Sequence, residues 1–595
     1  MARIPIINAT ATRRRSSSDL FMENGIWILK KHLAEKGHTV EPLDLATHRF
    51  YREINPIVIS RILRKIYGFT FTRKNSFWSK LLNPAAGLLQ GLSARIRKQR
   101  MHSKLKHIAG ELDPDTRVFG IKVWYGEAFL WAKHLCNLVH RFHPECIVIA
   151  GGYHPTLYGK DFMDMSRFDA VVTGEGETPL QIILDTVDEN KKNWNKETVL
   201  NTLAEKVNNR TLPNTMIRKP DHSLVLSERT HPTEILHKEV PQYRFDGDEK
   251  MRVHILSDSV GCAWGKCSFC VHSSFYQEMI PKKVKCIVDE IESVREQGIG
   301  MFRFAGSDTY PSFGVRIARE ILKRGLNIRY SIGARATRHA AHPEVFETLI
   351  SQYTAMIRAG LRAVFMGGET GNAWVNEHVM NKGITPEDIR WSIRALRKAE
   401  QAAGEKVYIS LAYIYPVPTM GEVSRDRVFE DNLTLVRESR PDAVMVTPPV
   451  PFKQSDWYRE RERYGFNLAD DFFRQLMTYE YVVYKPVHMW EELELGLEDM
   501  DFKQLMAECG RMKQAIRDLG IDTDVSDEHY LMEIAAGYTK NRKEFAFQSM
   551  LDIISGDYRF LESVNVRINR YSRGLAVDRK ADEFLSTNIY AAVNK

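Results

Sequence analysis

Short apolar segments alternate with amphipathic ones over the first 190 residues. Apolar positions recur at helical spacing over residues 19–33, with Ser18 or Asp19 as N-cap, and over residues 128–142. Between and around these helices, short, apolar, partly β-branched runs predict buried strands at residues 4–7, 38–45, 118–123, 146–150 and 170–172. Strands that alternate with helices predict an α/β fold, here a doubly wound parallel sheet over residues 1–189.

The same rhythm returns after Met251. Six apolar runs predict strands at residues 253–256, 301–304, 328–332, 363–366, 407–411 and 443–446. Amphipathic helices such as residues 312–324 and 385–403 separate them, and polar residues or glycines follow the strands. This pattern predicts a partial (β/α)6 barrel over residues 251–490, with its active site at the carboxyl ends of the strands.

Three further segments complete the predicted organisation. Residues 48–107 read as a helical insertion in the first domain. Residues 190–250 are polar and contain four prolines, which predicts a linker with one hairpin around Asp221–Ser223. After about residue 491 the pattern becomes helical, with helices expected at 502–519, 527–538 and 542–555, followed by a polar tail. We therefore expect a C-terminal helical domain over residues 491–595.

Composition adds a compartment and a charge pattern. The composition, 43% hydrophobic and 27% charged residues, is typical of soluble globular proteins. A chain of 595 residues is too long for one hydrophobic core. No apolar run approaches the roughly 20 residues that span a bilayer, and the arginines at 13–15 lead into no apolar stretch. Seven cysteines, an odd number with three clustered, suit a reducing compartment, so we expect a cytoplasmic protein.

The net charge of +8 is concentrated in one block. Residues 48–107 contain fourteen Lys or Arg and a single acid, Glu53. A solvated helical insertion explains this block, and so does docking to a membrane surface or another anionic partner, because apolar residues interleave with the charges. No nucleic-acid-binding motif accompanies the basic residues, so we expect no nucleic-acid partner.

The strongest chemical signal is a cluster of three cysteines, Cys262, Cys267 and Cys270, directly after the strand at 253–256. Thiolates favour iron–sulfur clusters or zinc, and filled sites of both kinds usually have four protein ligands. His272 would complete a Cys3His zinc site, whereas three ligands alone suit a cluster with one open iron. The second interpretation is favoured, because one residue between Cys270 and His272 is shorter than usual zinc-finger spacings. Free structural cysteines are the third alternative.

Glycines mark two strand ends in the first domain. Gly151 and Gly152 follow one predicted strand, and Gly174 and Gly176 follow the next. Ligands of doubly wound sheets bind at the carboxyl ends of the strands, where the lack of a side chain lets backbone approach a large ligand closely.

The cysteine cluster, with the aromatic Phe269 before its last cysteine, resembles the radical S-adenosylmethionine (SAM) enzymes. The sequence departs from their usual pattern by one residue, because four residues rather than three separate Cys262 from Cys267. Residues 367–370, 380–385 and 418–422 add to the resemblance. It implies that the three cysteines hold a [4Fe–4S] cluster whose fourth iron binds SAM.

The resemblance also implies roles for residues at the barrel rim. Glu369 is a candidate for the ribose or amino group of SAM, in a cofactor-binding set with Phe269, Gly367 and Gly368. Asp308 and Arg335 would be catalytic residues that line the SAM and substrate cavity. A turn or cap role is the alternative for Asp308, and an Arg at a strand end suits a carboxylate or phosphate.

Residues 149–155 and 168–178 resemble the cobalamin-binding domain that precedes the barrel in cobalamin-dependent radical SAM enzymes. The Asp-x-His-x-x-Gly motif that supplies a histidine to the lower face of cobalamin elsewhere is absent. A hydrogen-bonding or structural role is therefore expected for His154 rather than ligation. The resemblance implies a cobalamin site at Gly151, Gly152, His154, Gly174, Glu175, Gly176 and Glu177.

The activity implied by the resemblance is methylation of an unactivated carbon or phosphorus in a small-molecule or natural-product substrate. It would use a 5′-deoxyadenosyl radical and methylcobalamin, with electrons from a flavodoxin or ferredoxin type of donor. One alternative is a cyclase or rearrangement enzyme, like the anaerobic tetrapyrrole-cyclising relatives. An alternative of another class is a zinc-stabilised protein that binds anionic partners through residues 48–107.

Overall fold

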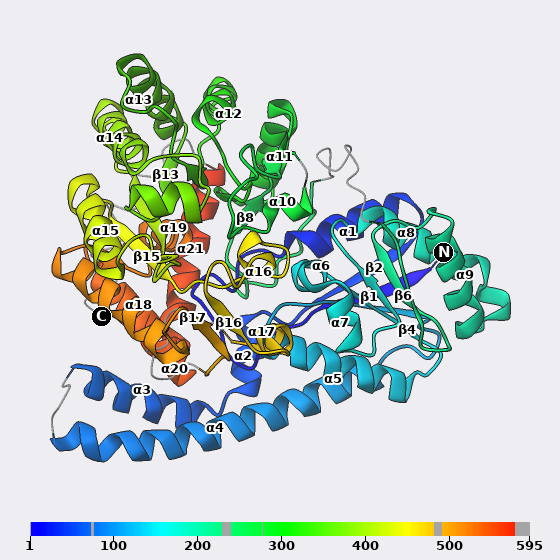
Figure 1. The fold of residues 1–595 in the computed structure, drawn as a ribbon. Helices are drawn as coiled ribbons and strands as arrows, with labels where there is room; N and C mark the ends of the chain where they lie inside the picture. Colours follow the sequence, from blue (N-terminus) through cyan, green and yellow to red (C-terminus); the bar gives the residue numbers. More distant parts are fainter. Residues whose placement is uncertain (1, 73–76, 229–239, 277, 481–490, 578–595) are drawn as a thin grey trace. The chain divides into compact units, whose positions relative to one another are not determined.

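The computed structural model describes residues 2–72, 77–228, 240–276, 278–480 and 491–577 (Figure 1). The chain divides into two compact units. Unit 1 comprises Met1–Lys250, Phe473–Lys485 and Ala546–Ser563. Unit 2 comprises Met251–Phe472, Pro486–Phe545 and Val564–Lys595. Each unit is built around its own seven-stranded sheet.

The sheet of unit 1 has the strand order β2-β1-β3-β4-β5-β6-β7. Its strands are β1 (Arg3–Asn8), β2 (Thr39–Asp44), β3 (Val118–Lys122), β4 (Ile147–Gly151), β5 (Ala170–Val172), β6 (Thr215–Arg218) and β7 (Leu224–Leu226). The first five pair in parallel, whereas β6 and β7 are antiparallel. The prediction of a doubly wound parallel sheet is confirmed. The order 2-1-3-4-5 places the topological switch point beside β1, where ligands of such sheets bind.

The helices of unit 1 pack their apolar faces onto this sheet. They are α1 (Asn24–Glu35), α5 (Glu127–Phe142), α6 (Tyr153–Tyr158), α7 (Lys160–Asp164), α8 (Glu177–Glu189), the short 3-10 helix η1 (Lys191–Asn193) and α9 (Lys196–Asn208). The first helix begins later than predicted, because Glu23 is its N-cap and accepts the Ile26 N–H at 3.4 Å. Residues 9–22, expected partly as helix, form a largely buried loop after β1.

The prediction of a polar linker over residues 190–250 is wrong for residues 196–226. Helix α9 buries five apolar residues, Val199, Leu200, Leu203, Ala204 and Val207, in the main core of unit 1. Its solvent-facing side is polar enough to give the segment the composition of a linker. The hairpin expected around Asp221–Ser223 is confirmed, because this turn joins the antiparallel strands β6 and β7.

The basic segment 48–107 is helical, as predicted. It forms α2 (His48–Ile54), α3 (Ile57–Thr72) and α4 (Phe77–Gly110), and Figure 1 shows α3 and α4 side by side. Leu63, Tyr67 and Ala86 share a small core with Leu551 and Ile554, which belong to the part of α20 (Arg542–Ser555) in unit 1. No helix in the described part of the chain combines the length and apolar character needed to cross a bilayer.

The main sheet of unit 2 is parallel throughout, in the order β18-β15-β14-β13-β12-β11-β8. Its strands are β8 (Val253–Leu256), β11 (Met301–Phe304), β12 (Arg329–Arg335), β13 (Leu361–Glu369), β14 (Tyr408–Ile414), β15 (Ala443–Thr447) and the edge strand β18 (Asp522–Thr523). The six expected strands and the partial-barrel prediction are confirmed. The flanking helices are α11 (Val284–Glu296), α12 (Pro311–Lys323), α13 (Pro343–Arg358), α14 (Pro386–Ala403) and α15 (Arg425–Ser439).

Short elements connect the barrel to its rim. They are β9 (Ser259–Val260), α10 (His272–Phe275), β10 (Ile280–Pro281), the π-helical turn η3 (Val375–Val379), α16 (Asp456–Arg459), β16 (Phe466–Leu468) and β17 (Leu495–Leu497). Helix α17 (Phe472–Thr478) belongs almost wholly to unit 1. Strands β9 and β10 pair antiparallel, as do β16 and β17.

The C-terminal region is helical, with α18 (Phe502–Asp518), α19 (Asp527–Ala536), α20 and α21 (Arg559–Val577). Helix α21 lies where the sequence suggested a polar tail. Its second half packs beneath β8 and β11, because Ser572 accepts the Gly300 N–H at 2.9 Å and donates to the Arg252 carbonyl at 2.6 Å. Residues 578–595 of the expected tail lie outside the described residues.

Candidate functional site

The cysteine loop, residues 261–271 of unit 2, connects β9 to α10 at the carboxyl rim of the barrel. Cys262, Cys267 and Cys270 are free thiols and half-buried. Burial raises the pKa of the Cys267 thiol to about 12, and the nearby Lys382 ammonium acts against this rise. Burial also raises the pKa of Cys270, while the His272 N–H, which donates to its Sγ at 3.4 Å, favours the thiolate.

The loop is held in place by residues far away in sequence. The Ser268 N–H donates to the Met380 carbonyl at 3.0 Å, and the Ser268 carbonyl accepts the Trp457 N–H at 3.1 Å. The Trp264 indole N–H donates to the Asn381 carbonyl at 2.7 Å. These bonds fix the loop against the segment that follows β13, so the positions of the cysteines are set by the barrel.

A buried ion pair lies beside the cysteine loop. Lys382 Nζ is 2.6 Å from Glu369 Oε1, and the two side chains are only 7% and 10% exposed. Burial alone would lower the pKa of Lys382, but the charges of Glu369 and Cys267 outweigh it and raise the pKa. The ammonium also lies 5.7 Å from the centroid of the Phe269 ring. Lys382 therefore contacts both the Glu369 carboxylate and the cysteine loop.

Glu369 and the two glycines before it end β13. Glu369 has a φ of 60°, a conformation that side-chain-bearing residues adopt at a cost of about 1–3 kcal/mol. A Cβ on Gly367 would lie 2.7 Å from Glu369 Oε1 and 2.8 Å from Lys382 Nζ. A side chain at position 367 would therefore push the ends of Glu369 and Lys382 out of this arrangement. Gly368 lies between Gly367 and Glu369 on the same strand.

Asp308 and Arg335 lie together at the barrel rim. The Arg335 N–H donates to Asp308 Oδ1 at 3.0 Å, and the Arg335 guanidinium donates to the Lys382 carbonyl. Burial raises the pKa of Asp308, although the Arg335 N–H and the charges of Arg335 and Lys382 favour its carboxylate. Asp308 thus makes a backbone contact typical of a turn residue and also lies at the barrel rim.

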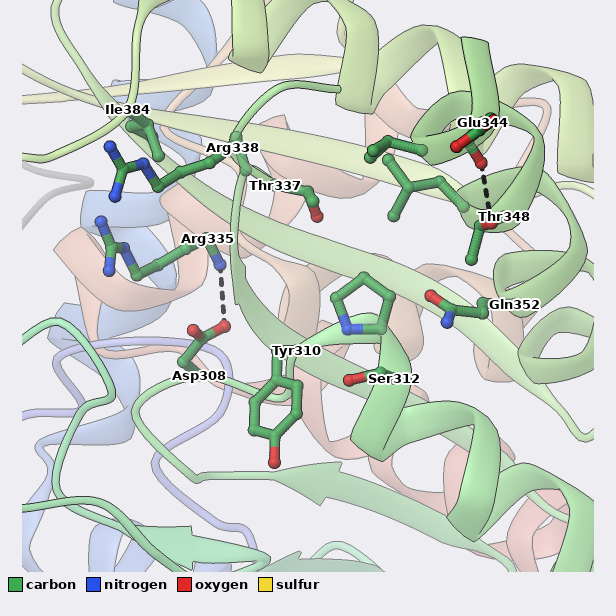
Figure 2. A pocket seen from close by; sticks show the side chains of 14 residues that line it. Asp308, Tyr310, Ser312, Arg335, Thr337, Arg338, Glu344, Thr348, Gln352 and Ile384 are labelled. Carbon is green, nitrogen blue, oxygen red and sulfur yellow. Dashed lines mark hydrogen bonds between the residues drawn. The ribbon is translucent and has the colours of Figure 1, made fainter. Parts of the chain in front are cut away.

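A cavity of about 500 Å³ opens next to this pair (Figure 2). Its walls come from the segments after β11 and β12 and from α13. Figure 2 shows the Arg335 and Arg338 side chains extending in the same direction, and both guanidinium groups lie over the Trp264 ring, at 5.3 and 5.8 Å from its centroid. The fourteen lining residues include Tyr310, Ser312, Thr337, Glu344, Thr348 and Gln352. The cavity is mixed polar and apolar and lies within reach of the loop tryptophan.

Asp258 is a rim residue that the sequence reasoning missed. It lies two residues after the end of β8 and is fully buried. Its carboxyl group accepts the Gly306 N–H at 2.8 Å and the Thr309 hydroxyl at 2.8 Å, which fixes the loop carrying Asp308. Burial raises the pKa of Asp258 to about 6. The signal available in the sequence was an acidic residue two positions after a buried strand.

The donor chemistry of the loop fits an iron–sulfur cluster better than zinc. Among the described residues, no group of three or more His, Cys, Asp or Glu side chains could hold one metal ion. The His272 ring is instead engaged with the Ser307 hydroxyl, at 3.0 Å from Nδ1. The cysteines of a [4Fe–4S] cluster ligate different irons and stand further apart than the ligands of one ion. The Cys3His zinc site therefore receives no support.

In unit 1, the two glycine turns lie next to each other at the carboxyl edge of the sheet. Thr156 connects them, because its hydroxyl donates to the Gly152 carbonyl at 2.7 Å and accepts the Gly174 N–H at 2.8 Å. Gly152 has a φ of 108°, and a Cβ there would lie 3.3 Å from the Val123 carbonyl oxygen. The turns thus form one surface, with Gly151 ending β4 and Glu175, Gly176 and Glu177 leading into α8.

His154 lies inside unit 1 behind this surface. Its ring is 2% exposed and packs against Phe129, Tyr158 and Phe162, with centroid distances of 5.1, 4.8 and 5.9 Å. Burial, with the charge of Arg15, lowers its pKa to about 3, so the imidazole is neutral. These contacts support the structural role that was expected for His154.

Comparison with known proteins gives both sequence relatives and structural neighbours. No family model matches the chain. An anaerobic magnesium-protoporphyrin IX monomethyl ester cyclase of Rubrivivax gelatinosus is 24% identical over 342 residues, 55% of this chain and 56% of the relative. The enzyme of the same name from Cereibacter sphaeroides is 26% identical over 321 residues, 50% of this chain and 47% of the relative. The chain thus spans about half the length of these relatives.

The structural neighbours cover more of the chain at lower identity. The radical SAM methyltransferase TsrM from Kitasatospora setae, with cobalamin and a [4Fe–4S] cluster bound, has a TM-score of 0.59 at 14% identity, covering 92% of this chain and 99% of TsrM. The cobalamin-dependent SAM radical enzyme OxsB, with aqua-cobalamin bound, has a TM-score of 0.50 at 15% identity, covering 91% and 61%. The resemblance to cobalamin-dependent radical SAM enzymes is confirmed in the fold.

Proposed function

We propose that the chain is an enzyme that uses a [4Fe–4S] cluster, SAM and cobalamin together. The observation that carries the proposal is the cysteine loop, whose three free thiols are held against the Glu369–Lys382 pair at the rim of a parallel partial barrel. The paired glycine turns of unit 1 support the cobalamin part, and so does the shared fold with TsrM and OxsB. When bound, the cluster and SAM would supply a carbon radical, and cobalamin a transferable methyl group.

The residues of the barrel rim would bind and orient these groups. Cys262, Cys267 and Cys270 would hold the cluster, with Lys382 favouring the thiolate form of Cys267. Glu369 already binds the Lys382 ammonium, so a positively charged SAM would share this carboxylate or displace the lysine. Arg335, with Asp308 on its backbone, would face a carboxylate or phosphate in the adjoining cavity.

The proposed reaction is methylation of an unactivated carbon or phosphorus of a small-molecule substrate. TsrM, a radical SAM methyltransferase, supports this reaction, because the fold that it shares with this protein covers 92% of this chain. A cyclase is the second candidate, favoured by the names of the two sequence relatives. Either reaction consumes electrons one at a time, so we infer an external donor of flavodoxin or ferredoxin type.

The two candidates differ in what they do with SAM. The full chain, reconstituted anaerobically with iron, sulfide and cobalamin, would be given a low-potential reductant and SAM labelled in its methyl group. A methyltransferase should form both 5′-deoxyadenosine and S-adenosylhomocysteine, with label transferred to cobalamin. A cyclase should form deoxyadenosine with little S-adenosylhomocysteine.

The Cys267→Ala chain is the control, because it should lose deoxyadenosine formation. With a substrate in hand, labelled product and roughly equal amounts of the two nucleosides would support methylation. The proposal fails if the intact chain forms neither nucleoside, or if Cys267→Ala forms as much deoxyadenosine as the intact chain.

A further inference from the structure

Unit 1 contains an arginine cluster, Arg13, Arg14 and Arg97, around the Tyr558 ring. Arg13 and Arg14 belong to the loop between β1 and α1, and Arg97 lies on α4. The Arg14 guanidinium lies 5.7 Å from the centroid of the Tyr558 ring, and the Arg14 N–H donates to its hydroxyl at 3.1 Å. Arg13 and Arg97 also act electrostatically on the Tyr558 phenol, so all three arginines lie within electrostatic reach of this ring.

The guanidinium groups are buried but only partly satisfied. Arg14 and Arg97 are each 1% exposed. Arg14 donates from Nη2 to the Ser17 carbonyl at 2.7 Å, yet its Nε and Nη1 have no hydrogen-bond partner among the described residues. Arg97 donates from Nη1 to the Ser93 hydroxyl at 2.6 Å, and its Nε has no partner in the same part of the chain. The buried Ser17 hydroxyl is likewise unpaired there.

The charge of the cluster is only partly balanced by acids, because Glu562, which interacts electrostatically with Arg14, already lies 3.4 Å from the Arg52 guanidinium. Within the described residues, none of the three arginines forms an ion pair. Glu127 acts on Arg97 from a distance, but its carboxylate is occupied by Thr12, at 2.7 Å from the hydroxyl, and by the Trp131 indole N–H at 3.1 Å. Arg15, by contrast, has Asp19 and further groups that stabilise its charge.

Two titratable groups report the same positive field. Burial and the Arg13 charge lower the pKa of Arg97 to about 10. Burial and the charges of Arg14, Arg52 and Lys250 lower the pKa of His48 to about 2, so His48 stays neutral. A buried, unpaired charge costs several kcal/mol, so a site that retains two of them, on Arg14 and Arg97, beside the half-buried Arg13 favours a compensating anion.

The position of the cluster suits a ligand site. The loop of Arg13 and Arg14 follows the carboxyl end of β1, the strand between β2 and β3. Doubly wound sheets bind their ligands at this switch point. Guanidinium groups present planar pairs of donors that match carboxylate and phosphate oxygens.

We propose that Arg13, Arg14 and Arg97 bind one oxyanion, a phosphate or carboxylate group of a ligand, at the switch point of the unit 1 sheet. Arg97 comes from the basic insertion, so this insertion contributes to a binding site as well as to the surface. The site stands independently of the chemistry assigned to the barrel.

The test is thermal unfolding of the full chain in chloride and, at equal ionic strength, in inorganic phosphate, sulfate or acetate. A bound oxyanion should raise the unfolding temperature in proportion to the logarithm of its concentration. Arg97→Met and Arg14→Met should reduce the apparent affinity for that anion about tenfold or more, because each removes a charge-assisted donor. In chloride, Arg97→Met should unfold at the same or a higher temperature than the natural chain.

Two further variants keep the test decisive. Arg13 is half-buried and makes no hydrogen bond or ion pair with the described residues, so Arg13→Met should fold normally and still weaken anion binding. Arg64 is the matched control, because it lies 2.8 Å from the buried Asp552 carboxylate. Arg64→Met should lower the unfolding temperature in every buffer and keep the anion-dependent shift.

A second measurement identifies the source of the oxyanion. Retention of cobalamin is compared with retention of cobinamide, which lacks the nucleotide phosphate, by visible absorption. If Arg97→Met weakens cobalamin but not cobinamide, the phosphate of cobalamin occupies the site, and if it weakens neither, the oxyanion belongs to another ligand. The proposal is overturned if no anion stabilises the natural chain, or if Arg13→Met and Arg97→Met keep the full shift.

Discussion

Loss of the Lys382 ammonium should destabilise unit 2 strongly, because it would leave Glu369 charged and buried. The two charged atoms are 2.6 Å apart, with side chains 7% and 10% exposed. Unit charges about 4 Å apart attract by about 4 kcal/mol at an effective dielectric constant of 20. Breaking a buried pair from one side costs about 3–5 kcal/mol, so both routes predict a loss of about 4 kcal/mol for Lys382→Met.

The pH range of this effect follows from the sign of the lysine shift. The pKa of Lys382 is raised in the folded chain, so its contribution is complete below the ordinary lysine pKa. It is lost only as the pH rises through the raised value. The measurement therefore belongs near pH 7, where the full cost should be seen.

Urea unfolding of the full chain, followed by fluorescence, measures the cost through Lys382→Met, Glu369→Gln and the double variant. With a slope of about 3 kcal/mol per M, the single lysine variant should lower the midpoint of the unit 2 transition by roughly 1 M. The double variant should recover much of the loss, because it buries no unpaired charge. The control is Lys285→Met. Lys285 pairs with Asp289 at the surface, where the two side chains are 80% and 40% exposed, so its loss should cost less than about 1 kcal/mol.

Two outcomes would contradict this account of the ion pair. The first is a cost for Lys382→Met that is no larger than for Lys285→Met. The second is a double variant whose loss equals the sum of the two single losses, since strict additivity would mean that the pair is not coupled.

Three further predictions concern the other parts of the candidate sites. Alanine in place of any of the three cysteines of the cysteine loop should abolish iron incorporation, measured after anaerobic reconstitution. Cys286→Ala in α11 is the control and should still bind iron. Full iron content in a loop variant would refute the ligand assignment. Gly152→Ala should lose cobalamin on gel filtration, because its Cβ would lie 3.3 Å from a backbone oxygen and the residue has a φ of 108°. Gly176→Ala should retain cobalamin, because its Cβ would contact the Leu29 side chain at 3.4 Å. Equal retention by the two variants would count against this surface. The free energy of unfolding should fall by about 3 kcal/mol as the pH rises from about 4 to about 6, because the pKa of Asp258 is raised to about 6 in the folded chain. Denaturant titrations of Asp258→Asn should lack this pH dependence. An unchanged pH dependence would show that another group is responsible.

Most strands of the two sheets were predictable because they are short, apolar and buried, whereas the edge strands β7 and β18 are only partly buried. Strand β11 spans Met301–Phe304, the bounds that the sequence predicts, and β5 spans Ala170–Val172. The segments that the sequence did not predict as part of a core combine a buried apolar side with a polar exposed side. Helix α9 buries only one stripe, and α21 buries residues such as Leu561, Val564 and Ile568 at helical spacing within a polar stretch. Only contacts with the rest of a unit show that these segments belong to a core.

The candidate site divides in the same way. The cysteines, Glu369 and the glycine turns were visible because each carries its signal within a few neighbouring residues. Lys382 and Asp258 carry no such signal, since their roles depend on partners distant in sequence. Glu369 is joined to Lys382, and Asp258 to Thr309, only once the barrel strands have assembled. Local pattern therefore identifies the candidate ligands, whereas the charged residues around them become apparent only from the fold.

The anchoring of the cysteine loop also sets the order of events during biosynthesis. The Trp264 indole bonds to a carbonyl 117 residues further along the chain, at Asn381. At about 5–20 residues per second, a ribosome needs roughly 6–25 seconds to make that stretch. During this interval the three thiols have been synthesised but their loop has no anchor. For the proposed [4Fe–4S] cluster, insertion before this point would meet unplaced thiols, so we expect insertion into a chain that has already completed most of its barrel.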